Sequence, residues 1–275
     1  MKLPPLLWGV MALGIVSTSC STGPAPGTPA FLWNAAKQTY ESGDFIKAHD
    51  NLQDIVQSEN DYTSRARAWL MVLAAGLTQG HAELADAYEA GAGKNRTNPL
   101  AFRKEVSAQR HLAATSALEL AQAARSFREK DQAPEVMLAF AYPTGSVNQP
   151  PGLKKVSDGT IIPDSEKAQL ETTMVRRGVV LAASAAVGSP EDPARALENF
   201  KAGEAHVPRG TFLYATAKAL ADNADLFSSK KLDQVDRFKV MYEEASQALR
   251  LIPETKETKQ LDYTIKSKLK KGKPS

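Results

Sequence analysis

The sequence is short of the side chains on which most catalytic and metal chemistry depends. Its 275 residues include one cysteine, Cys20, and four histidines. A single cysteine excludes an internal disulfide framework and any zinc site built from paired cysteines. The histidines are widely separated along the chain: His49, His81, His111 and His206. We therefore expect no metal site, no cofactor and no catalytic residue.

The motifs of the common enzyme classes are missing as well. The sequence contains no HExxH, no G-x-S-x-G, no CxxC and no glycine-rich dinucleotide loop. The segment GAGKN at 91–95 has part of a phosphate loop, but Tyr88 stands where that motif needs its first glycine. Asn95 follows the lysine, where the motif has Ser or Thr. The sequence predicts a protein that is not an enzyme.

Neither sign of charge dominates. The chain has 34 Lys and Arg against 31 Asp and Glu, a net charge of +3. Nucleic-acid-binding domains usually carry a basic face, so we expect no nucleic-acid partner. The positive excess lies near the C-terminus, in a Lys-rich segment at 254–275. We expect a solvated helix or tail there, and contact with an anionic lipid or polymer is the alternative.

An uncharged apolar run, LLWGVMALGIV, occupies residues 6–16. It has the length of a signal-peptide core and is too short for a membrane-spanning helix. Ser17-Thr18-Ser19 and then Cys20 follow it. Small residues before a cysteine resemble the lipobox of bacterial lipoproteins, in which that cysteine is acylated and becomes the new N-terminus. An ordinary secretory signal with an incidental cysteine is the alternative.

The lipoprotein resemblance implies a membrane anchor and a location. It implies a signal peptide at 1–19, a lipid on Cys20 and a flexible Pro/Gly/Ser/Thr tether at 20–30. Each buried CH₂ of an acyl chain contributes about 0.8 kcal/mol, so several chains hold a protein firmly on a bilayer. Ser21, rather than Asp, follows the cysteine. We expect a protein of the cell envelope, on the outer membrane and facing the periplasm, with the inner membrane as the alternative.

Residues 31–253 show the periodicity of paired helices. Trp33, Ala36 and Tyr40 share one helical face, and Gly43 and Asp44 suit the end of one helix and the start of the next. A second apolar stripe follows at Phe45, Ala48, Leu52, Ile55 and Val56. The segment YEEASQALRLIP at 242–253 repeats the spacing with Ala245, Ala248, Leu249 and Pro253.

These spacings resemble the tetratricopeptide repeat (TPR). The resemblance implies an all-α fold of stacked antiparallel helical hairpins, a TPR-like α-solenoid over 31–253, because no single hairpin buries its apolar face alone. It also implies a concave groove that binds a protein or peptide partner.

The middle of the chain fits the repeats less well. The pattern predicts a helix over 62–78 that breaks at Gln79-Gly80, and a partner helix over 81–90. The segment 99–130 reads as one long helix or two helices. The residues expected on its buried side are Leu100, Val106, His111, Leu112, Ala114, Leu118, Ala121 and Phe127. Two further helices are expected at 134–142 and 165–187.

A Pro-rich insertion at 143–164, PTGSVNQPPGLKKVSDGTIIPD, interrupts the helices. Its Asp158-Gly159 turn between LKKVS and TII predicts a small β-hairpin near 152–163. Long irregular insertions are often functional. We expect a recognition loop here, with a mere connector as the alternative, and its candidate contacts are Asn148, Gln149, Lys154 and Lys155.

These observations support three hypotheses of function. The first is a protein-interaction scaffold, which contacts the membrane through lipidated Cys20 and a partner through its groove. The second is a solute-binding accessory lipoprotein of a transport system, because the apolar segments 66–77 and 179–187 are suited to line a cavity. The third is a hydrolase of an envelope polymer, which only the predicted location in the cell envelope supports.

Overall fold

A computed structural model describes residues 23–271. Ten α-helices and one two-stranded sheet make up this range, which confirms the predicted all-α class with a small β element. Cys20 and the predicted signal peptide at 1–19 lie outside the described residues.

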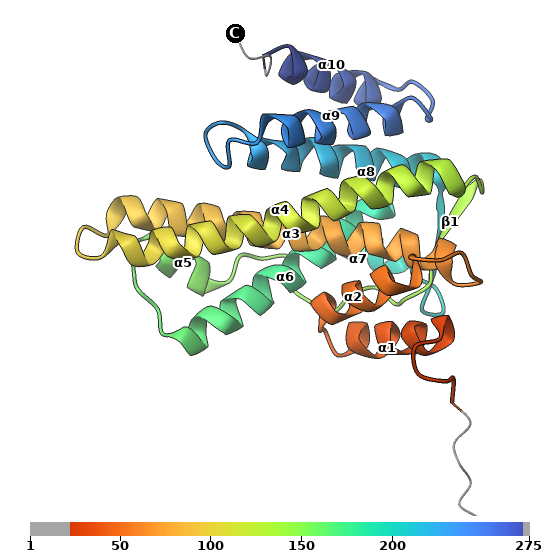
Figure 1. Ribbon diagram of the computed structural model, residues 1–275, viewed down its shortest axis with the longest axis horizontal. Coiled ribbons are helices and arrows are strands. Elements are labelled where there is room, and N and C mark those ends of the chain that lie inside the picture. The colour runs from red at the N-terminus through yellow and green to blue at the C-terminus, as the bar shows by residue number, and fades with distance from the viewer. Residues whose placement is uncertain (1–22, 272–275) are drawn as a thin grey trace, which may run out of the picture.

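Antiparallel helical hairpins follow one another from the bottom to the top of the molecule in Figure 1. The first hairpin consists of α1 (Pro29–Glu41) and α2 (Phe45–Ile55). The long central pair is α3 (Thr63–Lys94) and α4 (Pro99–Lys130). The third consists of α8 (Arg209–Ala224), which ends in a 3₁₀ turn at Asp225–Phe227, and α9 (Val235–Leu249), and α10 (Lys256–Lys271) covers α9.

Local signals fix the ends of these helices as the sequence predicts. Gly43 has a positive φ of 80° and closes the turn after α1. Asp44 then caps α2, because its carboxylate accepts a hydrogen bond from the backbone N–H of Lys47 at 3.2 Å. Asn98 caps α4 in the same way, and Pro99 occupies the first turn, where no N–H is needed.

The predicted break at 79–80 is wrong, because α3 runs unbroken through it. A Cβ on Gly80 would lie 2.6 Å from the carbonyl oxygen of Met174, on α6 (Asp164–Ala186). A Cβ on Gly178 of α6 would lie 2.1 Å from the carbonyl oxygen of Gly76. These glycines therefore let the backbones of α3 and α6 touch where the helices cross, and Gly80 is a packing residue.

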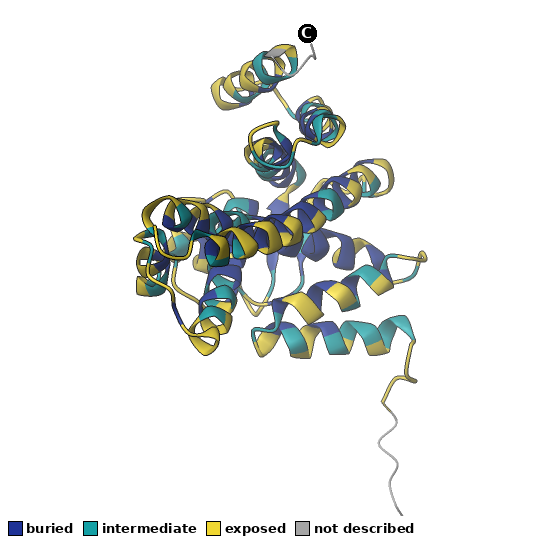
Figure 2. Ribbon diagram, turned by 60° about the vertical axis from the view of Figure 1, so that its left-hand side comes forward, coloured by how far each residue is buried: buried dark blue, intermediate teal, exposed yellow. Residues whose placement is uncertain are grey.

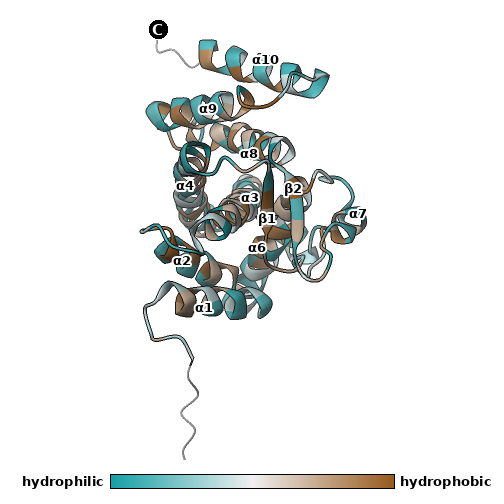
Figure 3. Cartoon of the chain, turned by 90° about the vertical axis from the view of Figure 1, so that its right-hand side faces the viewer, coloured by the Kyte–Doolittle hydropathy of each residue, from teal (hydrophilic) through white to brown (hydrophobic). Residues whose placement is uncertain are grey.

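Helix α3 is the centre of the molecule. It contacts α2, α4, α5 (Pro151–Ser157), α6, α8 and the sheet, and in the end-on view of Figure 3 the other elements surround it. Its Trp69 is fully buried, and Figure 2 shows buried residues concentrated along this central layer. Among residues 23–271, no helix combines the length and hydropathy that crossing a bilayer requires.

The sheet replaces the helix predicted over 134–142. Strand β1 (Glu135–Leu138) pairs antiparallel with β2 (Ala205–Pro208), so that Leu138 lies opposite Ala205. Alternate side chains of β1 point into the core, with Val136 and Leu138 buried. This period of two is the strand pattern, and four residues were too few to distinguish it from a helix.

The β-hairpin predicted near 152–163 is also wrong, because its first half is helix α5 (Pro151–Ser157). Leu153 and Val156 of this helix are buried against α3 and α6. Gly159 does take a positive φ of 87°, but it follows the C-terminus of α5 instead of joining two strands. The six-residue helix α7 (Pro193–Glu198) lies between α6 and β2.

Helix α4 is continuous, and its buried face agrees with the prediction only in part. Leu100 is 71% exposed, and His111 and Leu112 are exposed as well. Val106, Ala114, Ala121 and Phe127 are buried as predicted, and the buried side also includes Phe102, Ala113, Ala117 and Leu120. At the C-terminal end of the described chain, α10 is a packed helix, with Ile265 buried.

Candidate pocket between α3, α6 and α8

A pocket of about 410 Å³ lies where α8 faces the crossing of α3 and α6. This volume falls within the range of small-molecule sites, roughly 300–1,000 Å³. Helices α3 and α6 contribute one wall each, and α8 contributes the third. The lining residues are Met71, Val72, Ala75 and Gln79 of α3; Leu120 of α4; Leu181, Ala182, Ala185 and Ala186 of α6; Gly188 and Pro190; and Thr211, Phe212, Tyr214, Ala215, Thr216, Lys218, Ala219, Asp222 and Asn223 of α8.

The pocket exists because its walls are built from short side chains. Six of its lining residues are alanines, which come from all three helices. An alanine methyl group reaches only a short way from its helix, so α8 cannot fill the space beside the α3–α6 crossing. Helix α8 itself packs most extensively against α9, which holds it in place from the other side.

The inner end of the pocket is apolar. Met71, Leu120 and Phe212 are almost completely buried there. The buried hydroxyl of Thr216 donates a hydrogen bond to the carbonyl oxygen of Phe212, 2.9 Å away. Because that donor is already used, the inner end favours apolar ligand atoms over charges and hydrogen-bond acceptors, and a ligand donor could at most reach the Thr216 oxygen.

The rim of the pocket is polar, and its charged and amide groups are already paired. Lys218 Nζ lies 2.7 Å from Asp222 Oδ2, one helical turn along α8. Gln79 donates to a Glu83 oxygen at 3.0 Å, and Asn223 donates to the carbonyl of Ala219 at 2.8 Å. Lys218 and Asp222 are the two charged residues among the described residues of the lining, so the rim has no net charge.

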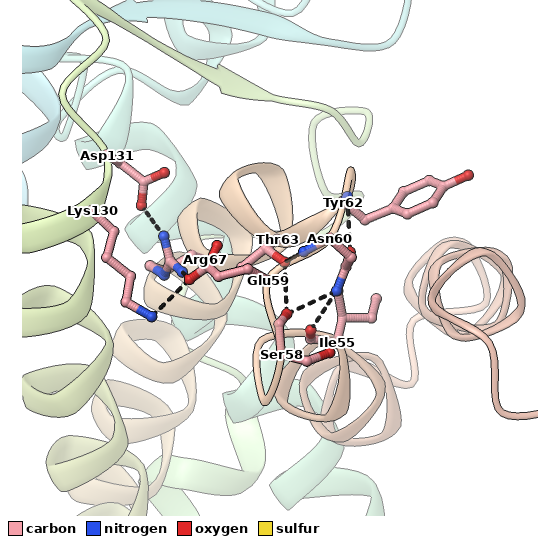
Figure 4. A network of polar contacts seen from close by, with 9 residues as sticks. All are labelled: Ile55, Ser58, Glu59, Asn60, Tyr62, Thr63, Arg67, Lys130 and Asp131. Carbon is pink, nitrogen blue, oxygen red and sulfur yellow. Dashed lines mark hydrogen bonds and ion pairs between the residues drawn. The ribbon is translucent and has the colours of Figure 1, made fainter.

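A polar network lies away from this pocket, at the loop between α2 and α3 (Figure 4). The buried guanidinium of Arg67 binds Asp131 and lies 3.0 Å from a Glu59 oxygen. The same Glu59 oxygen accepts from Lys130 at 2.7 Å. The hydrogen bond from Lys130, and then the charge of Arg67, lower the pKa of Glu59. The network fastens the loop to the end of α4, which is a structural role.

A second buried network ties α4 to α9. Both oxygens of Glu244, which is 2% exposed, accept hydrogen bonds from arginines. Arg125 donates at 2.6 and 2.8 Å, and Arg128 donates at 2.5 Å. These charge-assisted bonds hold α9, and with it α8, against the central pair. They fix the third wall of the pocket indirectly.

Two of the four histidines, His49 and His81, are buried in the core, and His111 and His206 are exposed. His81 Nδ1 lies 2.7 Å from Gln109 Oε1 inside the core. His49 is buried between α2 and α4, with its Nε2 3.5 Å from a Glu119 oxygen. Burial raises the pKa of Glu119, and the nearby His49 opposes that rise. In the part of the chain that the structure describes, no group of three or more His, Cys, Asp or Glu is placed to hold a metal ion.

The four candidate recognition residues are all exposed and belong to two different segments. Lys154 and Lys155 are on α5, where they pair with Asp158 and, at 3.5 Å, with Glu166. Asn148 and Gln149 lie on the extended segment that precedes α5. This segment is fastened to the body, because Arg177 Nε donates to the carbonyl oxygen of Val147, 2.7 Å away. Lipidation of Cys20 lies outside the described residues.

Sequence reasoning identified two walls of the pocket and missed the third. The segments 66–77 and 179–187, expected to line a cavity, supply the walls on α3 and α6. Helix α8 supplies the third wall, and nothing in its sequence indicated what its face toward α6 would meet. The alanines at 215 and 219, close to the Lys218–Asp222 pair, are the signal that was available.

Comparison of the chain with known protein families, with curated proteins and with solved structures gives no match.

Proposed function

We propose that this chain is a lipid-anchored, non-catalytic accessory protein of the cell envelope that binds an apolar small molecule in the pocket between α3, α6 and α8. The observation that carries the proposal is the pocket itself, with its apolar inner end and polar rim. A ligand that buried about 200 Å² of apolar surface there would gain about 5 kcal/mol from desolvation, before the costs of association.

The chemistry of the lining supports binding over catalysis. The described residues that line the pocket include no histidine, cysteine or glutamate, and their one Lys–Asp pair is an ion pair within a single helix. An acid–base couple needs two titratable groups with different surroundings, and these two share the same exposed rim. A hydrolase of envelope polymer therefore gains no support from the pocket.

A fluorescence titration with N-phenyl-1-naphthylamine tests the proposal, because the emission of this apolar probe rises when it leaves water. The wild-type protein should bind it saturably. Ala215→Leu places three more carbon atoms in the pocket and should weaken binding at least tenfold. Ala108→Leu, at an exposed position on α4, is the matched control and should bind as the wild type does. Absence of saturable binding, or equal binding by Ala215→Leu, would contradict the proposal.

The membrane anchor has a separate test. Cys20→Ser removes the thiol that acylation requires, so metabolic labelling with a fatty acid should fail in the variant. The variant should also move from the membrane fraction to the soluble fraction of the cells. Equal labelling of both forms would refute lipidation at Cys20.

A protein-interaction scaffold is the second candidate. Two apolar side chains favour it, Leu100 at 71% and Ile161 at 53% exposure. Both lie within a few residues of the Asn95–Gly159 hydrogen bond, near the turn between α3 and α4. A photo-crosslinking residue at Leu100 should give one discrete adduct that is absent when it replaces the exposed Gln122 on α4. The same adducts at both positions would argue against a docking surface.

A further inference from the structure

The depth of the pocket sets where the polar part of a ligand lies. At the inner end, the described lining offers methyl, methylene and ring carbons, and the hydroxyl of Thr216 is already bonded to the Phe212 carbonyl. A ligand charge or hydrogen-bond acceptor placed there would lose its hydration without gaining a donor, and a ligand hydroxyl could at most donate to the Thr216 oxygen. The apolar part of a ligand therefore enters first, and the polar head stays at the rim.

The rim discriminates among polar heads by charge. Lys218 and Asp222 form an ion pair at 2.7 Å, and both are about half exposed. An anionic head drawn to Lys218 meets Asp222 beside it, and a cationic head drawn to Asp222 meets Lys218. Attraction and repulsion nearly cancel for either ion, so the rim offers charged heads little net gain.

The rim does offer hydrogen bonds to an uncharged head. The amide nitrogens of Gln79 and Asn223 donate to a carboxylate and a backbone carbonyl, which are acceptors only. This fixes the amide orientation and leaves each side-chain oxygen as an acceptor and one N–H of each amide as a donor, so a head that both donates and accepts is matched. The two oxygens belong to α3 and α8, on different walls of the pocket.

Building on the binding function proposed above, we propose that the pocket selects neutral amphiphiles, with an aliphatic body and an uncharged head that donates hydrogen bonds, such as an alcohol. The alanine walls contact the body, and the paired rim excludes a preference for either charge. The Lys218–Asp222 pair is thus a specificity device for the pocket.

A competition series tests this ligand class at pH 7. Octan-1-ol, octanoate and octylamine share one chain length and differ in the head, and each is titrated against bound N-phenyl-1-naphthylamine. We expect octan-1-ol to displace the probe at least fivefold more effectively than either ion. If an ion competes as well as the alcohol, the proposed selectivity is wrong, although the binding function stands. If the probe itself does not bind, the binding function fails first.

Two rim variants separate the effect of the rim from the general reluctance of ions to leave water. Asp222→Asn leaves Lys218 unpaired and should improve competition by octanoate about threefold, with octan-1-ol unchanged. Lys218→Gln should do the same for octylamine. Asp262→Asn breaks the equivalent i,i+4 pair with Lys266 on α10, outside the pocket lining, and should change none of the three. If neither rim variant shifts these ratios, the heads do not lie at this rim and the proposal is overturned.

Discussion

A methyl group at position 178 tests the close crossing of α3 and α6. A Cβ on Gly178 would lie 2.1 Å from the carbonyl oxygen of Gly76 and 3.0 Å from the backbone nitrogen of Gly80. These are backbone atoms of a buried helix, so no side-chain rotation relieves the clash. Helix α3 cannot retreat, because α4 packs along it as well.

The size of the effect follows from two opposing terms. Overpacking a buried site costs about 1–3 kcal/mol, and contact with the backbone places Gly178→Ala at the upper end. Alanine regains about 1 kcal/mol over glycine through helix propensity. We expect a net loss of about 2 kcal/mol, which lowers the melting temperature by about 4–8 °C in a domain of this size.

Thermal unfolding followed by circular dichroism at the helix band measures this change. The matched control is Gly93→Ala, in α3 itself, where a Cβ would meet nothing within 4 Å. That variant keeps the propensity gain without the clash, and it should be stabilised by about 0.5–1 kcal/mol. Opposite signs in the two variants would confirm the crossing. A Gly178→Ala protein as stable as the wild type would refute the backbone contact between α3 and α6.

Three further predictions concern polar contacts. Glu244→Gln leaves the buried guanidinium of Arg128 without its counter-charge and should lower the free energy of unfolding by about 3–5 kcal/mol, measured by chemical denaturation. A loss below about 1 kcal/mol would mean that this network does not hold α9. Tyr40→Phe removes the 2.7 Å bond to the Ala141 carbonyl and should cost about 1–3 kcal/mol in the same assay; an unchanged stability would contradict that bond. Hydrogen bonds from Lys154 and then Lys94 hold the pKa of Asp158 at about 2, below its ordinary 3.8. Ionised Asp158 therefore stabilises the folded state above pH 3.8, and this stabilisation is lost as the pH falls through 2. The melting temperatures of the wild type and of Asp158→Asn should converge over that pH range. A difference in melting temperature that stays constant with pH would refute the role of these two lysines.

Local signals in the sequence were sufficient for some elements. The end of α1 and the start of α2 depend on Gly43 and Asp44, whose conformations and hydrogen bonds are set within a few residues. Helix α6 was predicted over 165–187 and runs over 164–186. In such cases the deciding interactions lie within the segment itself, so a single sequence contains them.

Other elements depended on partners that are distant in the chain. In the sequence, a glycine that breaks a helix cannot be told from one that lets two helices pack closely. The role of Gly80 follows only from the backbone of Met174, which lies against it. Asp158-Gly159 is a turn signal for a hairpin and for a helix end alike. Helix α4 is rich in alanine, which fits either a buried or an exposed face. Its pattern therefore predicted the buried Val106 and Phe127 but placed the exposed Leu100 and His111 on the same side.

The candidate pocket shows the same division. The apolar character of the segments on α3 and α6 indicated two walls of the pocket, but the pocket itself depends on the position of α8. That position depends on α9 and on the Glu244 network, and no local pattern reports it. The recognition residues proposed in the Pro-rich insertion were chosen from composition alone, and the structure distributes them over an extended segment and a helix.

The small sheet has a consequence for the order in which the chain acquires its shape. Strand β1 leaves the biosynthetic machinery soon after α1 to α4, but its partner β2 emerges only after α5, α6 and α7. Until then the edge of β1 has no strand to pair with, and the closing of so long a loop carries an entropic cost. Nascent chains halted before Ala205 should therefore contain the first two hairpins and a β1 strand with an unpaired edge, which is prone to aggregation. A chaperone that binds unfolded segments would matter most during this interval.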